Sequence, residues 1–232
     1  MSTVLVTGAS RGLGLELVRQ YAAEGWDVLA CARDPHQAEE LRELAEQSQG
    51  RVAVHPLDVT DFDAIGSLAL ELEGRSIDVL INNAGTMGSR VGAFGSVDFA
   101  EWEGVFRLNA FAPMRMAEAF AGHVARSAQK KLVSISTLMA SMARNNMGGF
   151  YAYRASKAAL NAIMVSLSLD LGRRHGILAA TLHPGWVRTD MGGGRAEIDP
   201  RTSVAGMRQV IASLTKERAG RFWAYDGSEL PW

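Results

Sequence analysis

Short apolar runs alternate with amphipathic stretches along the whole chain. Runs such as Val4-Leu5-Val6 and Val79-Leu80-Ile81 are continuously apolar, which is typical of parallel strands buried on both faces of a sheet. The pattern predicts strands at residues 3–7, 27–32, 51–55, 77–81, 131–137, 178–183 and 221–224. Helical periodicity fills the segments between them, for example at residues 13–24, 37–47 and 151–173. This alternation predicts a doubly wound α/β fold in a single domain over residues 1–232, with a seven-stranded, mostly parallel sheet and helices on both faces.

The composition is that of a globular protein with an ordinary core. Hydrophobic residues make up 47% and charged residues 21% of the 232 positions, and the formal net charge is −1. This balance gives no reason to expect a nucleic-acid or membrane partner, and no apolar stretch reaches the ~18 residues that span a bilayer. The first predicted strand leaves no room for a signal peptide, so we expect a cytoplasmic protein. The single cysteine, Cys31, cannot form an internal disulfide and is expected in the core, and no metal site is expected.

A glycine-rich loop, Thr7-Gly8-Ala9-Ser10-Arg11-Gly12-Leu13-Gly14, follows the first predicted strand and opens a helix. Gly8 allows a sharp turn, and Gly12 and Gly14 present no side chain to an anion that approaches the helix N-terminus. The spacing G-x-x-x-G-x-G departs from the G-x-G-x-x-G dinucleotide fingerprint, and a tight turn without a ligand would also need glycine. Ligands of doubly wound sheets bind at the carboxyl ends of the strands, where this loop lies. Its position therefore predicts a dinucleotide-binding, Rossmann-like fold.

The same loop also matches G-x-S-x-G, the nucleophile elbow of α/β hydrolases, at Gly8-Ala9-Ser10-Arg11-Gly12. A hydrolase would need an acidic residue and then a histidine further along the chain. The last histidine, His183, precedes Asp190, and the elbow follows the very first strand. The sequence therefore disfavours a hydrolase.

The end of the second predicted strand bears on the choice of dinucleotide. An acidic residue there would bind the ribose hydroxyls of NAD(H), whereas an arginine accepts the 2′-phosphate of NADP(H). The strand ends in Ala32-Arg33-Asp34, so Arg33 and Arg11 could form a pair of guanidinium clamps. Asp34 could point away or pair with Arg33, and both arginines could instead be solvated surface residues. We predict NADP(H) as the cofactor, with NAD(H) as the less favoured alternative.

Tyr153 and Lys157 form a Y-x-x-x-K pair on a predicted helix, where residues four apart share a face. Reduction of a carbonyl needs a proton donor whose conjugate base is tolerable near neutral pH, and a free tyrosine has a pKa of about 10. Moving that pKa to roughly 7 takes about 4 kcal/mol of stabilisation of the phenolate. We expect this stabilisation from the charge of Lys157 and from an oxidised nicotinamide. The pair alone is common by chance on helices, so its weight depends on the motifs around it.

Several further motifs occur in order along nearly the whole chain. They are the glycine loop 7–14, Asp58, Asn82-Asn83-Ala84-Gly85, Asn109, the strand end 134–137, Tyr153 with Lys157, and Pro184-Gly185. In this order and spacing they are highly specific, and the chain resembles the short-chain dehydrogenase/reductase family. Residues 183–193 and Tyr225-Asp226-Gly227 make it similar, within that family, to sniffer-type carbonyl reductases and bacterial C-factor proteins.

The resemblance implies a set of residues that bind the cofactor. Asp58 and Val59 would contact the adenine, and residues 83–85 would line the central stretch of the cofactor. Val187 would contact the carboxamide, and Thr189 the diphosphate or the amide. The full set is Gly8, Ser10, Arg11, Gly12, Leu13, Gly14, Arg33, Asp58, Val59, Asn83, Ala84, Gly85, Tyr153, Lys157, Pro184, Gly185, Val187 and Thr189.

The resemblance also implies a catalytic set of Asn109, Thr137, Tyr153 and Lys157. The family places a serine at the end of the fifth strand to bind the substrate carbonyl, and here that end reads Ser134-Ile135-Ser136-Thr137. Neighbours along a strand point to opposite faces, so Ser136 and Thr137 cannot both enter the site without a local twist. Register against the family favours Thr137, which supplies the same donor and acceptor, and leaves Ser136 a structural role. Asn109 would hold a water of a proton relay from Tyr153 through the ribose and Lys157, or would instead be a helix-kink or capping residue.

The family selects its substrate through the loop that follows Thr189, which here is short and glycine-rich before Asp199-Pro200 starts a helix. We expect a short, mobile lid over an open pocket, and a rim formed in part by residues 144–149. Aromatic and thioether walls suit apolar carbonyls. The candidate wall residues, each of which could equally be core, are Leu138, Met139, Met147, Trp186 and Met191.

Together these features predict an NADPH-dependent carbonyl reductase that acts on a small apolar or aromatic ketone, aldehyde or quinone, with Tyr153 as proton donor. The alternative is a C-factor-like signalling or sensor protein that binds NAD(P)H with little or no turnover. The complete set of Tyr153, Lys157 and Asn109 argues against that alternative. By resemblance we also expect a homodimer or homotetramer, formed through helices at residues 109–125 and 151–171.

Overall fold

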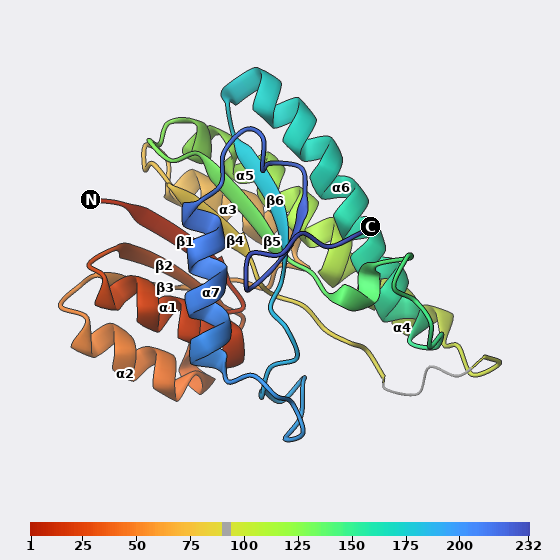
Figure 1. The fold of residues 1–232 in the computed structure, drawn as a ribbon. Coiled ribbons are helices and arrows are strands. Elements are labelled where there is room, and N and C mark those ends of the chain that lie inside the picture. The colour runs from red at the N-terminus through yellow and green to blue at the C-terminus, as the bar shows by residue number, and fades with distance from the viewer. Residues whose placement is uncertain (90–93) are drawn as a thin grey trace.

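The computed structural model of the protein describes residues 1–89 and 94–232 and places the strands of these residues in one sheet (Figure 1). The strands are β1 (Thr3–Thr7), β2 (Asp27–Ala32), β3 (Val52–Pro56), β4 (Val79–Asn82), β5 (Lys131–Ile135), β6 (Leu178–His183) and β7 (Phe222–Ala224). They lie in the order β3-β2-β1-β4-β5-β6-β7, and every neighbouring pair is parallel. The predicted seven-stranded Rossmann-like sheet is therefore confirmed, and it is parallel throughout.

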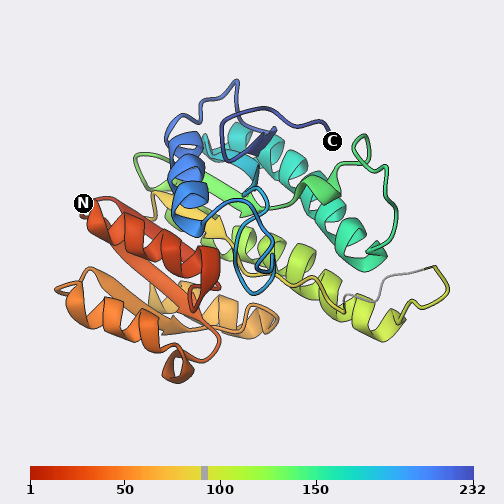
Figure 2. The same ribbon diagram turned by 60° about the horizontal axis from the view of Figure 1, so that its bottom comes forward.

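Helices cover both faces of this sheet (Figures 1 and 2). One face carries α1 (Gly12–Ala23), α2 (Glu39–Gln47) and α7 (Pro200–Ala212). The other carries α3 (Phe62–Glu71), α4 (Phe99–Phe106), α5 (Ala112–Ala125) and α6 (Tyr151–His175). Alternate strand residues enter the two cores, so Val4 and Val6 of β1 pack towards α1 and α7, while Leu5 packs towards α3 and α5.

The strand order fixes where a ligand can bind. β1 pairs with β2 on one side and with β4 on the other. Strands β2 and β3 are added on one side of β1 and strands β4 to β7 on the other, so the strand order reverses between β1 and β4. The loop after β1 leads to α1 on one face, and the loop after β4 leads towards α4 on the opposite face. A crevice at the carboxyl ends of the strands is expected at such a switch point.

The predicted strand ends differ from the structure by one or two residues. The segment predicted at 77–81 pairs as a strand only from Val79, because the main-chain N–H of Ile77 donates to the carbonyl oxygen of His123 at 3.1 Å. The segment predicted at 131–137 ends as a strand at Ile135, because Thr137 caps a 3-10 turn, Leu138–Ala140. The predicted start of a helix at Asp199-Pro200 is confirmed, since the Asp199 side chain accepts a hydrogen bond from the N–H of Thr202.

Cys31 is buried, and burial raises the pKa of its thiol to about 12. Among residues 1–89 and 94–232, no three His, Cys, Asp or Glu side chains are grouped so that they could hold a metal ion. None of the helices in the described part of the chain is both long and apolar enough to cross a membrane.

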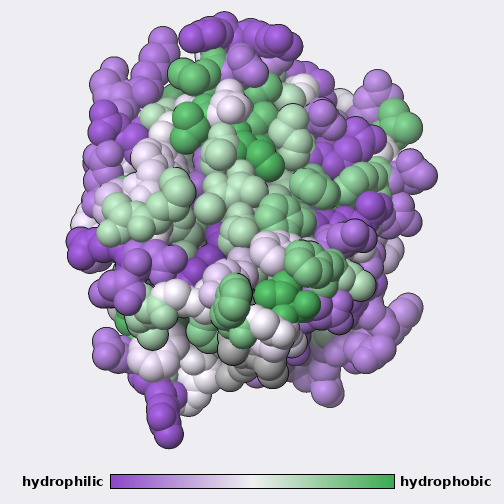
Figure 3. Space-filling model, turned by 90° about the vertical axis from the view of Figure 1, so that its right-hand side faces the viewer, coloured by the Kyte–Doolittle hydropathy of each residue, from purple (hydrophilic) through white to green (hydrophobic). Residues whose placement is uncertain are grey.

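Apolar side chains are exposed on the side of the molecule that carries α4 and α6 (Figure 3). On α4 and the segment after it, aromatic rings stand in a row, with centroids 5.7 Å apart between Phe99 and Trp102 and 6.3 Å apart between Trp102 and Phe106. Phe111 continues this row, and Leu169 is exposed on α6.

Candidate active site

The glycine loop after β1 lies against the loop after β4. Thr7 Oγ1 accepts hydrogen bonds from the main-chain N–H groups of Asn83 and Ala84 at 3.0 and 3.2 Å. Asn83 Nδ2 donates in turn to the carbonyl oxygens of Thr7 and Gly8 at 2.9 and 3.1 Å. A Cβ on Gly8 would lie 2.9 Å from the Ala84 Cα. These bonds fix the two loops side by side at the switch point.

The N-terminus of α1 is built to receive an anion. The N-cap residue Arg11 makes no side-chain hydrogen bond to the helix, so the N–H groups of the first turn have no intrahelical acceptor. A Cβ on Gly14 would lie 2.0 Å from the carbonyl oxygen of Gly8, so only glycine lets the helix start this close to the strand. Gly12 has a φ of 56°, a left-handed conformation that favours glycine. Free N–H groups without covering side chains fit the diphosphate of a dinucleotide.

The end of β2 presents an exposed arginine, Arg33, and a carboxylate that is already engaged. Asp34 Oδ1 accepts a hydrogen bond from the N–H of His36 at 3.0 Å, and Asp34 Oδ2 accepts one from Gln37. These contacts cap a 3-10 turn and, with the Gln37 bond as the largest cause, lower the pKa of Asp34. The Asp34 carboxylate is thus held in its own turn by residues that follow it.

Asp58 and Val59 follow β3 at the same edge of the sheet. Asp58 Oδ1 accepts hydrogen bonds from the N–H and the hydroxyl of Thr60 at 2.8 and 2.7 Å. Burial alone would raise the pKa of Asp58, but the Thr60 bonds and the nearby charges of Arg33 and Arg107 lower it below its ordinary value. Asp58 therefore stays ionised within the electrostatic reach of Arg33.

The second predicted clamp, Arg11, is engaged in an ion pair. Arg11 Nη1 contacts Asp190 Oδ2 at 3.1 Å, and this ion pair joins the glycine loop to the loop after β6. The two side chains are 78% and 77% exposed. An ion pair so exposed contributes less than about 1 kcal/mol, so it does not prevent Arg11 from turning to another anion.

Asn109 lies in a π-helical segment, Arg107–Phe111, between α4 and α5, and it is fully buried. Its Nδ2 donates to the Thr86 carbonyl oxygen at 2.8 Å and to Ser156 Oγ at 3.0 Å, and its Oδ1 accepts from the N–H of Thr86 at 2.9 Å. Pro113 has no N–H group, so it cannot supply the α-helical hydrogen bond to the carbonyl oxygen of Asn109. Wide helical turns of this kind occur frequently at functional sites. Asn109 thus marks an irregular turn and also joins the β4 loop to α6.

Tyr153 and Lys157 lie one turn apart in the first third of α6, and both are more than nine-tenths buried. Lys157 Nζ donates to the carbonyl oxygen of Ile135 at 2.8 Å, and burial lowers the pKa of Lys157 to about 8. A Cβ on Gly85 would lie 3.3 Å from Lys157 Nζ and 3.1 Å from Asn109 Oδ1. The absence of a side chain at Gly85 therefore gives the ammonium group its room.

The pKa of Tyr153 is raised in this structure. The lowering that the sequence analysis expects from Lys157 and an oxidised nicotinamide stays a prediction. Burial raises the pKa of the phenol, and a hydrogen bond with the Thr137 side chain lowers it only in part. A phenol in this setting keeps its proton at neutral pH, as a proton donor must.

Ser136 and Thr137 diverge at the end of β5. Ser136 is 3% exposed, and its Oγ donates to Asn161 Oδ1 on α6 at 2.7 Å. Thr137 Oγ1 accepts from the N–H of Met139 at 3.2 Å and lies within hydrogen-bonding reach of Tyr153. Thr137 is thus the hydroxyl on the side of Tyr153, and the Ser136 hydroxyl is engaged behind it.

The loop after β6 closes the crevice beside the glycine loop. A Cβ on Gly185 would lie 2.4 Å from Ile198 Cδ1 and 3.1 Å from the Tyr225 ring, and Ser203 Oγ donates to the Pro184 carbonyl oxygen at 2.6 Å. Val187 is buried, and a Cβ on Gly12 would lie 3.4 Å from the methyl group of Thr189. The structure therefore brings Thr189 to the glycine loop, across the crevice.

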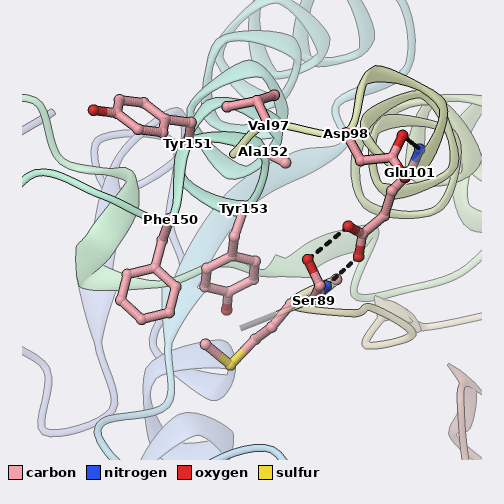
Figure 4. Close-up of a pocket in the computed structure, with 10 residues that line it drawn as sticks. Ser89, Val97, Asp98, Glu101, Phe150, Tyr151, Ala152 and Tyr153 are labelled. Atoms are coloured by element: carbon pink, nitrogen blue, oxygen red, sulfur yellow. Dashed lines mark hydrogen bonds between the residues drawn. The ribbon is translucent and has the colours of Figure 1, made fainter. Parts of the chain in front are cut away.

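A small, solvent-open hollow lies beside Tyr153 (Figure 4). Phe150 and Tyr153 stand next to each other on one wall, and Ser89 and Glu101 stand opposite. Ser89 donates hydrogen bonds from its N–H and its hydroxyl to the Glu101 carboxylate, which holds the loop after β4 against α4. The residues that line the hollow are Met87, Gly88, Ser89, Val97, Asp98, Glu101, Phe150, Tyr151, Ala152 and Tyr153. We call this space the Tyr153 hollow.

The five wall residues that the sequence suggests are not among the residues that line this hollow. Met147 is 82% exposed, and the indole Nε1 of Trp186 donates to the carbonyl oxygen of Gly192 at 2.9 Å. The other three are Leu138, Met139 and Met191. The hollow is lined by the loop after β4, by residues 97–101 and by the start of α6. The five residues therefore stay a prediction for the substrate pocket.

Hydrogen bonds join the two ends of the loop after Thr189, and its expected role as a short, mobile lid stays a prediction. The N–H of Arg188 donates to the carbonyl oxygen of Ile198 at 2.8 Å, and Arg188 Nη1 donates to those of Ala196 and Glu197. A Cβ on Gly192 would lie 1.9 Å from the Val187 carbonyl oxygen, so glycine is needed there for packing.

Two residues of the site are missed by reasoning from the sequence. Ser156 accepts the hydrogen bond from Asn109 and donates to the Tyr153 carbonyl oxygen at 2.9 Å, so it links the two. Its position between Tyr153 and Lys157 is the signal that could have found it. Phe150 precedes α6 with φ 50° and ψ 40°, a left-handed conformation that is rare for an aromatic residue, and no sequence signal marks it.

Comparisons with known proteins agree with this geometry. The family model described as short chain dehydrogenase matches residues 2–199. The chain is 46% identical to the C-signal protein of Myxococcus xanthus over 156 residues, which are 67% of this chain and 93% of that protein. The carbonyl reductase Sniffer of D. melanogaster superposes with a TM-score of 0.94 at 34% identity, with both chains covered completely.

A carbonyl reductase from chicken fatty liver, solved with bound NADPH, superposes with a TM-score of 0.92 at 33% identity over all of this chain and 99% of that one. The sequence match, the superpositions and the arrangement of the glycine loop, Tyr153 and Lys157 lead to one conclusion. The chain belongs to the short chain dehydrogenase family.

Proposed function

We propose that this chain is an NADPH-dependent oxidoreductase that reduces a small apolar or aromatic carbonyl compound to an alcohol. The observation that carries the proposal is the joint burial of Tyr153 and Lys157 on one face of α6, with Tyr153 forming a wall of an open hollow. A buried phenol beside a buried ammonium group has no evident structural benefit, since each loses hydration that it would keep at the surface. General acid catalysis gives such a pair a reason to exist.

The described residues fit a dinucleotide along the whole crevice. The open N-terminus of α1 suits the diphosphate, and Asp58 and Val59 lie at the strand end where the adenine would be held. Gly85, Lys157 and Thr189 border the remaining length. When bound, NADPH supplies the hydride for the reduction.

The residues of the chain supply the proton. The Tyr153 hydroxyl donates its proton to the carbonyl oxygen as the carbonyl carbon receives the hydride, so that an alcohol and a phenolate result. The Thr137 hydroxyl, which hydrogen-bonds to Tyr153, helps to hold the carbonyl oxygen and the developing phenolate. The ammonium group of Lys157 stabilises that phenolate through its charge. The hydrogen bond between Asn109 and Ser156 holds the π-helical turn at Asn109 against α6. In the proposed mechanism, the proton that Tyr153 loses is replaced from solvent by a relay that includes Asn109.

The apolar wall of the Tyr153 hollow supports an apolar substrate. Met87, Val97 and Phe150 contribute thioether, aliphatic and aromatic surface. Phe150 keeps a left-handed backbone conformation that costs of order 1 kcal/mol, and residues held in this way cluster at ligand sites. This conformation places the Phe150 ring next to Tyr153, where it can contact an apolar substrate.

The test is consumption of NADPH, followed by absorbance, with a panel of aromatic aldehydes, aromatic ketones and quinones. We expect saturable turnover of at least one class. Tight NADPH binding without turnover on the whole panel would favour the second candidate, a signalling or sensor protein. The similarity to the C-signal protein is the observation that favours this second candidate.

The cofactor preference gives a separate prediction. Arg33 is exposed at the end of β2, while the Asp34 carboxylate is engaged with His36 and Gln37, so Arg33 is placed to accept a 2′-phosphate. We expect Arg33→Ser to weaken NADPH binding by about 10- to 100-fold, the loss of one charge-assisted contact, and to leave NADH binding unchanged. Calorimetric titration with both dinucleotides measures this difference.

Arg42→Ser, which removes an exposed arginine from α2, is the matched control and should leave NADPH affinity unchanged. Equal losses of NADPH and NADH affinity in Arg33→Ser would show that Arg33 does not read the 2′-phosphate.

A further inference from the structure

The loop between β5 and α6 connects two residues of the candidate active site, Thr137 and Tyr153. It begins at Thr137, ends at Phe150 and leads directly to Tyr153. Phe150 occupies its left-handed conformation with no side-chain cap at the start of α6. A conformation of this kind persists only where surrounding contacts hold it. The contacts that hold this loop therefore bear on the shape of the Tyr153 hollow.

The final segment of the chain, residues 225–232, supplies part of that support. After β7 the chain turns at Tyr225–Ser228 and runs back beside β7, where the N–H of Leu230 donates to the Phe222 carbonyl oxygen at 2.8 Å. Arg221 Nη1 holds the returning segment through Glu229 at 2.8 Å. In Figures 1 and 2 the end marked C lies near the loop that precedes α6.

Trp232 joins this segment to the loop. Its main-chain oxygen accepts hydrogen bonds from Ser141 Oγ and from the N–H of Ala143, both at 3.0 Å. Ser141 is 1% exposed, and its Oγ also accepts from the N–H of Arg144 at 3.2 Å. The Trp232 ring stacks on Phe222 with a centroid distance of 5.6 Å and an interplanar angle of 15°. The stack fixes the place of the oxygen that receives the two hydrogen bonds.

The loop is also held from α6. Arg154 Nη1 donates to the carbonyl oxygen of Met139 at 3.0 Å, and Thr137 Oγ1 accepts from the N–H of the same residue. The first half of the loop is thus fixed by Arg154, and the turn at Ser141–Arg144 is fixed by Trp232. Between Arg144 and Phe150 the hydrogen bonds of the described residues stay within the loop: the N–H groups of Asn145, Asn146 and Gly148 donate to Met142, Arg144 and Asn145. The anchor at Trp232 is therefore the last one before Phe150.

We propose that Trp232 is a positioning residue for substrate binding: stacked on Phe222, it anchors the β5–α6 loop through Ser141 and Ala143, and so sets the place of Phe150 at the Tyr153 hollow. The proposal rests on the proposed carbonyl reduction. It assigns to the last segment of the chain a role in recognition of the substrate, although Trp232 does not line the hollow.

The test compares Trp232→Ala with Trp232→Phe in the full chain, using a carbonyl substrate that the unchanged protein turns over. Loss of the stack frees the loop, and a misplacement of about 1 Å at such a site can cost up to ~10²-fold. We expect Trp232→Ala to raise KM about tenfold with a smaller change in kcat, and to leave the Kd for NADPH unchanged. Trp232→Phe keeps an aromatic ring on Phe222 and should restore most of the affinity.

Two further variants separate positioning from general stability. Trp26→Ala removes a tryptophan that packs edge-on against Tyr21 on the far face of the sheet, and it should lower Tm without raising KM. Ser141→Ala removes the donor to Trp232, and in the double variant with Trp232→Ala its effect on KM should be less than additive.

An unchanged KM in Trp232→Ala, or additive effects in the double variant, would overturn the proposal. A rise in KM that follows the fall in Tm equally in Trp26→Ala and Trp232→Ala would do the same. Failure of the proposed function is recognised separately, because the unchanged protein would then turn over no carbonyl compound.

Discussion

Tyr153→Phe is expected to lower kcat/KM for carbonyl reduction by about 10²- to 10⁴-fold while NADPH still binds. The substitution removes one oxygen from a side chain that is 8% exposed and leaves the ring in its place on the wall of the hollow. Without the hydroxyl, the carbonyl oxygen has no positioned proton donor, and the neighbouring Thr137 hydroxyl is too weak an acid to replace it. Steady-state kinetics with NADPH, together with calorimetric measurement of NADPH affinity, separate loss of chemistry from loss of binding.

Tyr21→Phe is the matched control for this experiment. Tyr21 is also a buried phenol, in α1, and burial raises its pKa to about 12. Its removal should leave kcat/KM within a few-fold of the unchanged protein. Full activity in Tyr153→Phe would refute the assignment of the proton donor, and an equal loss in both variants would point to a general effect of losing a buried hydroxyl.

Lys157→Met is expected to stabilise the cofactor-free protein at pH 7 and to abolish most of its turnover. Burial lowers the pKa of Lys157 from 10.5 to about 8, which corresponds to a cost of about 3 kcal/mol for keeping this charge in the fold. Methionine has a similar length and carries no charge. It loses the charge-assisted bond from Nζ to the Ile135 carbonyl oxygen, about 2 kcal/mol, so we expect a net gain of about 1 kcal/mol in the free energy of unfolding.

The pH dependence of that gain identifies its origin. Between pH 8 and 10.5 the unfolded chain keeps a proton on Lys157 that the folded chain has released, so the stability of the unchanged protein rises with pH in this window. The cost is fully present below pH 8, and the advantage of Lys157→Met should shrink as the pH rises towards 10. Thermal melts at pH 7 and pH 10 measure this, with a rise in Tm of roughly 3 °C expected at pH 7.

Lys131→Met is the control for the loss of a buried ammonium group elsewhere. Lys131 lies in β5, where burial lowers its pKa, and Nζ donates to the Ala212 carbonyl oxygen at 3.0 Å, away from the Tyr153 hollow. Turnover should survive this change. A Lys157→Met variant that remains as active as Lys131→Met would remove Lys157 from the proposed mechanism.

The sheet could be predicted from the sequence because its strands carry their own signal. Val4-Leu5-Val6 and Val79-Leu80-Ile81 are continuously apolar because both faces are covered, and the structure buries each of these residues completely. The ends of strands were less certain, since whether Ile77 pairs with a strand or with His123 is decided by the packing of α5. The glycine loop follows β1, which lies at the switch point of the strand order, so this loop alone was enough to locate the crevice.

The lining of the Tyr153 hollow could not be predicted in the same way. The methionine and tryptophan candidates in the loops after β5 and β6 stay a prediction for the substrate pocket; Trp186 bonds within its own loop and Met147 faces solvent. The hollow is lined by Phe150, which has a left-handed backbone, and by Ser89 and Glu101, whose bond joins residues 12 positions apart. Neither feature has a local pattern. The sequence does allow reasoning about Ser136 and Thr137, because neighbours along a strand point to opposite faces and only one of the two hydroxyls can face Tyr153.

The phenol of Tyr153 and the ammonium group of Lys157 share one continuous helix of 25 residues, whereas most of the Tyr153 hollow is lined by the loop after β4, α4 and the start of α6. Helical geometry sets the spacing of Tyr153 and Lys157 at four residues, about 6 Å along the axis, whatever happens in the loops. Under the proposed function, the proton donor and the residues that contact the substrate therefore lie on different elements of the fold. Substitutions in the loops would then change which carbonyl compounds bind, while the spacing of Tyr153 and Lys157 would stay the same.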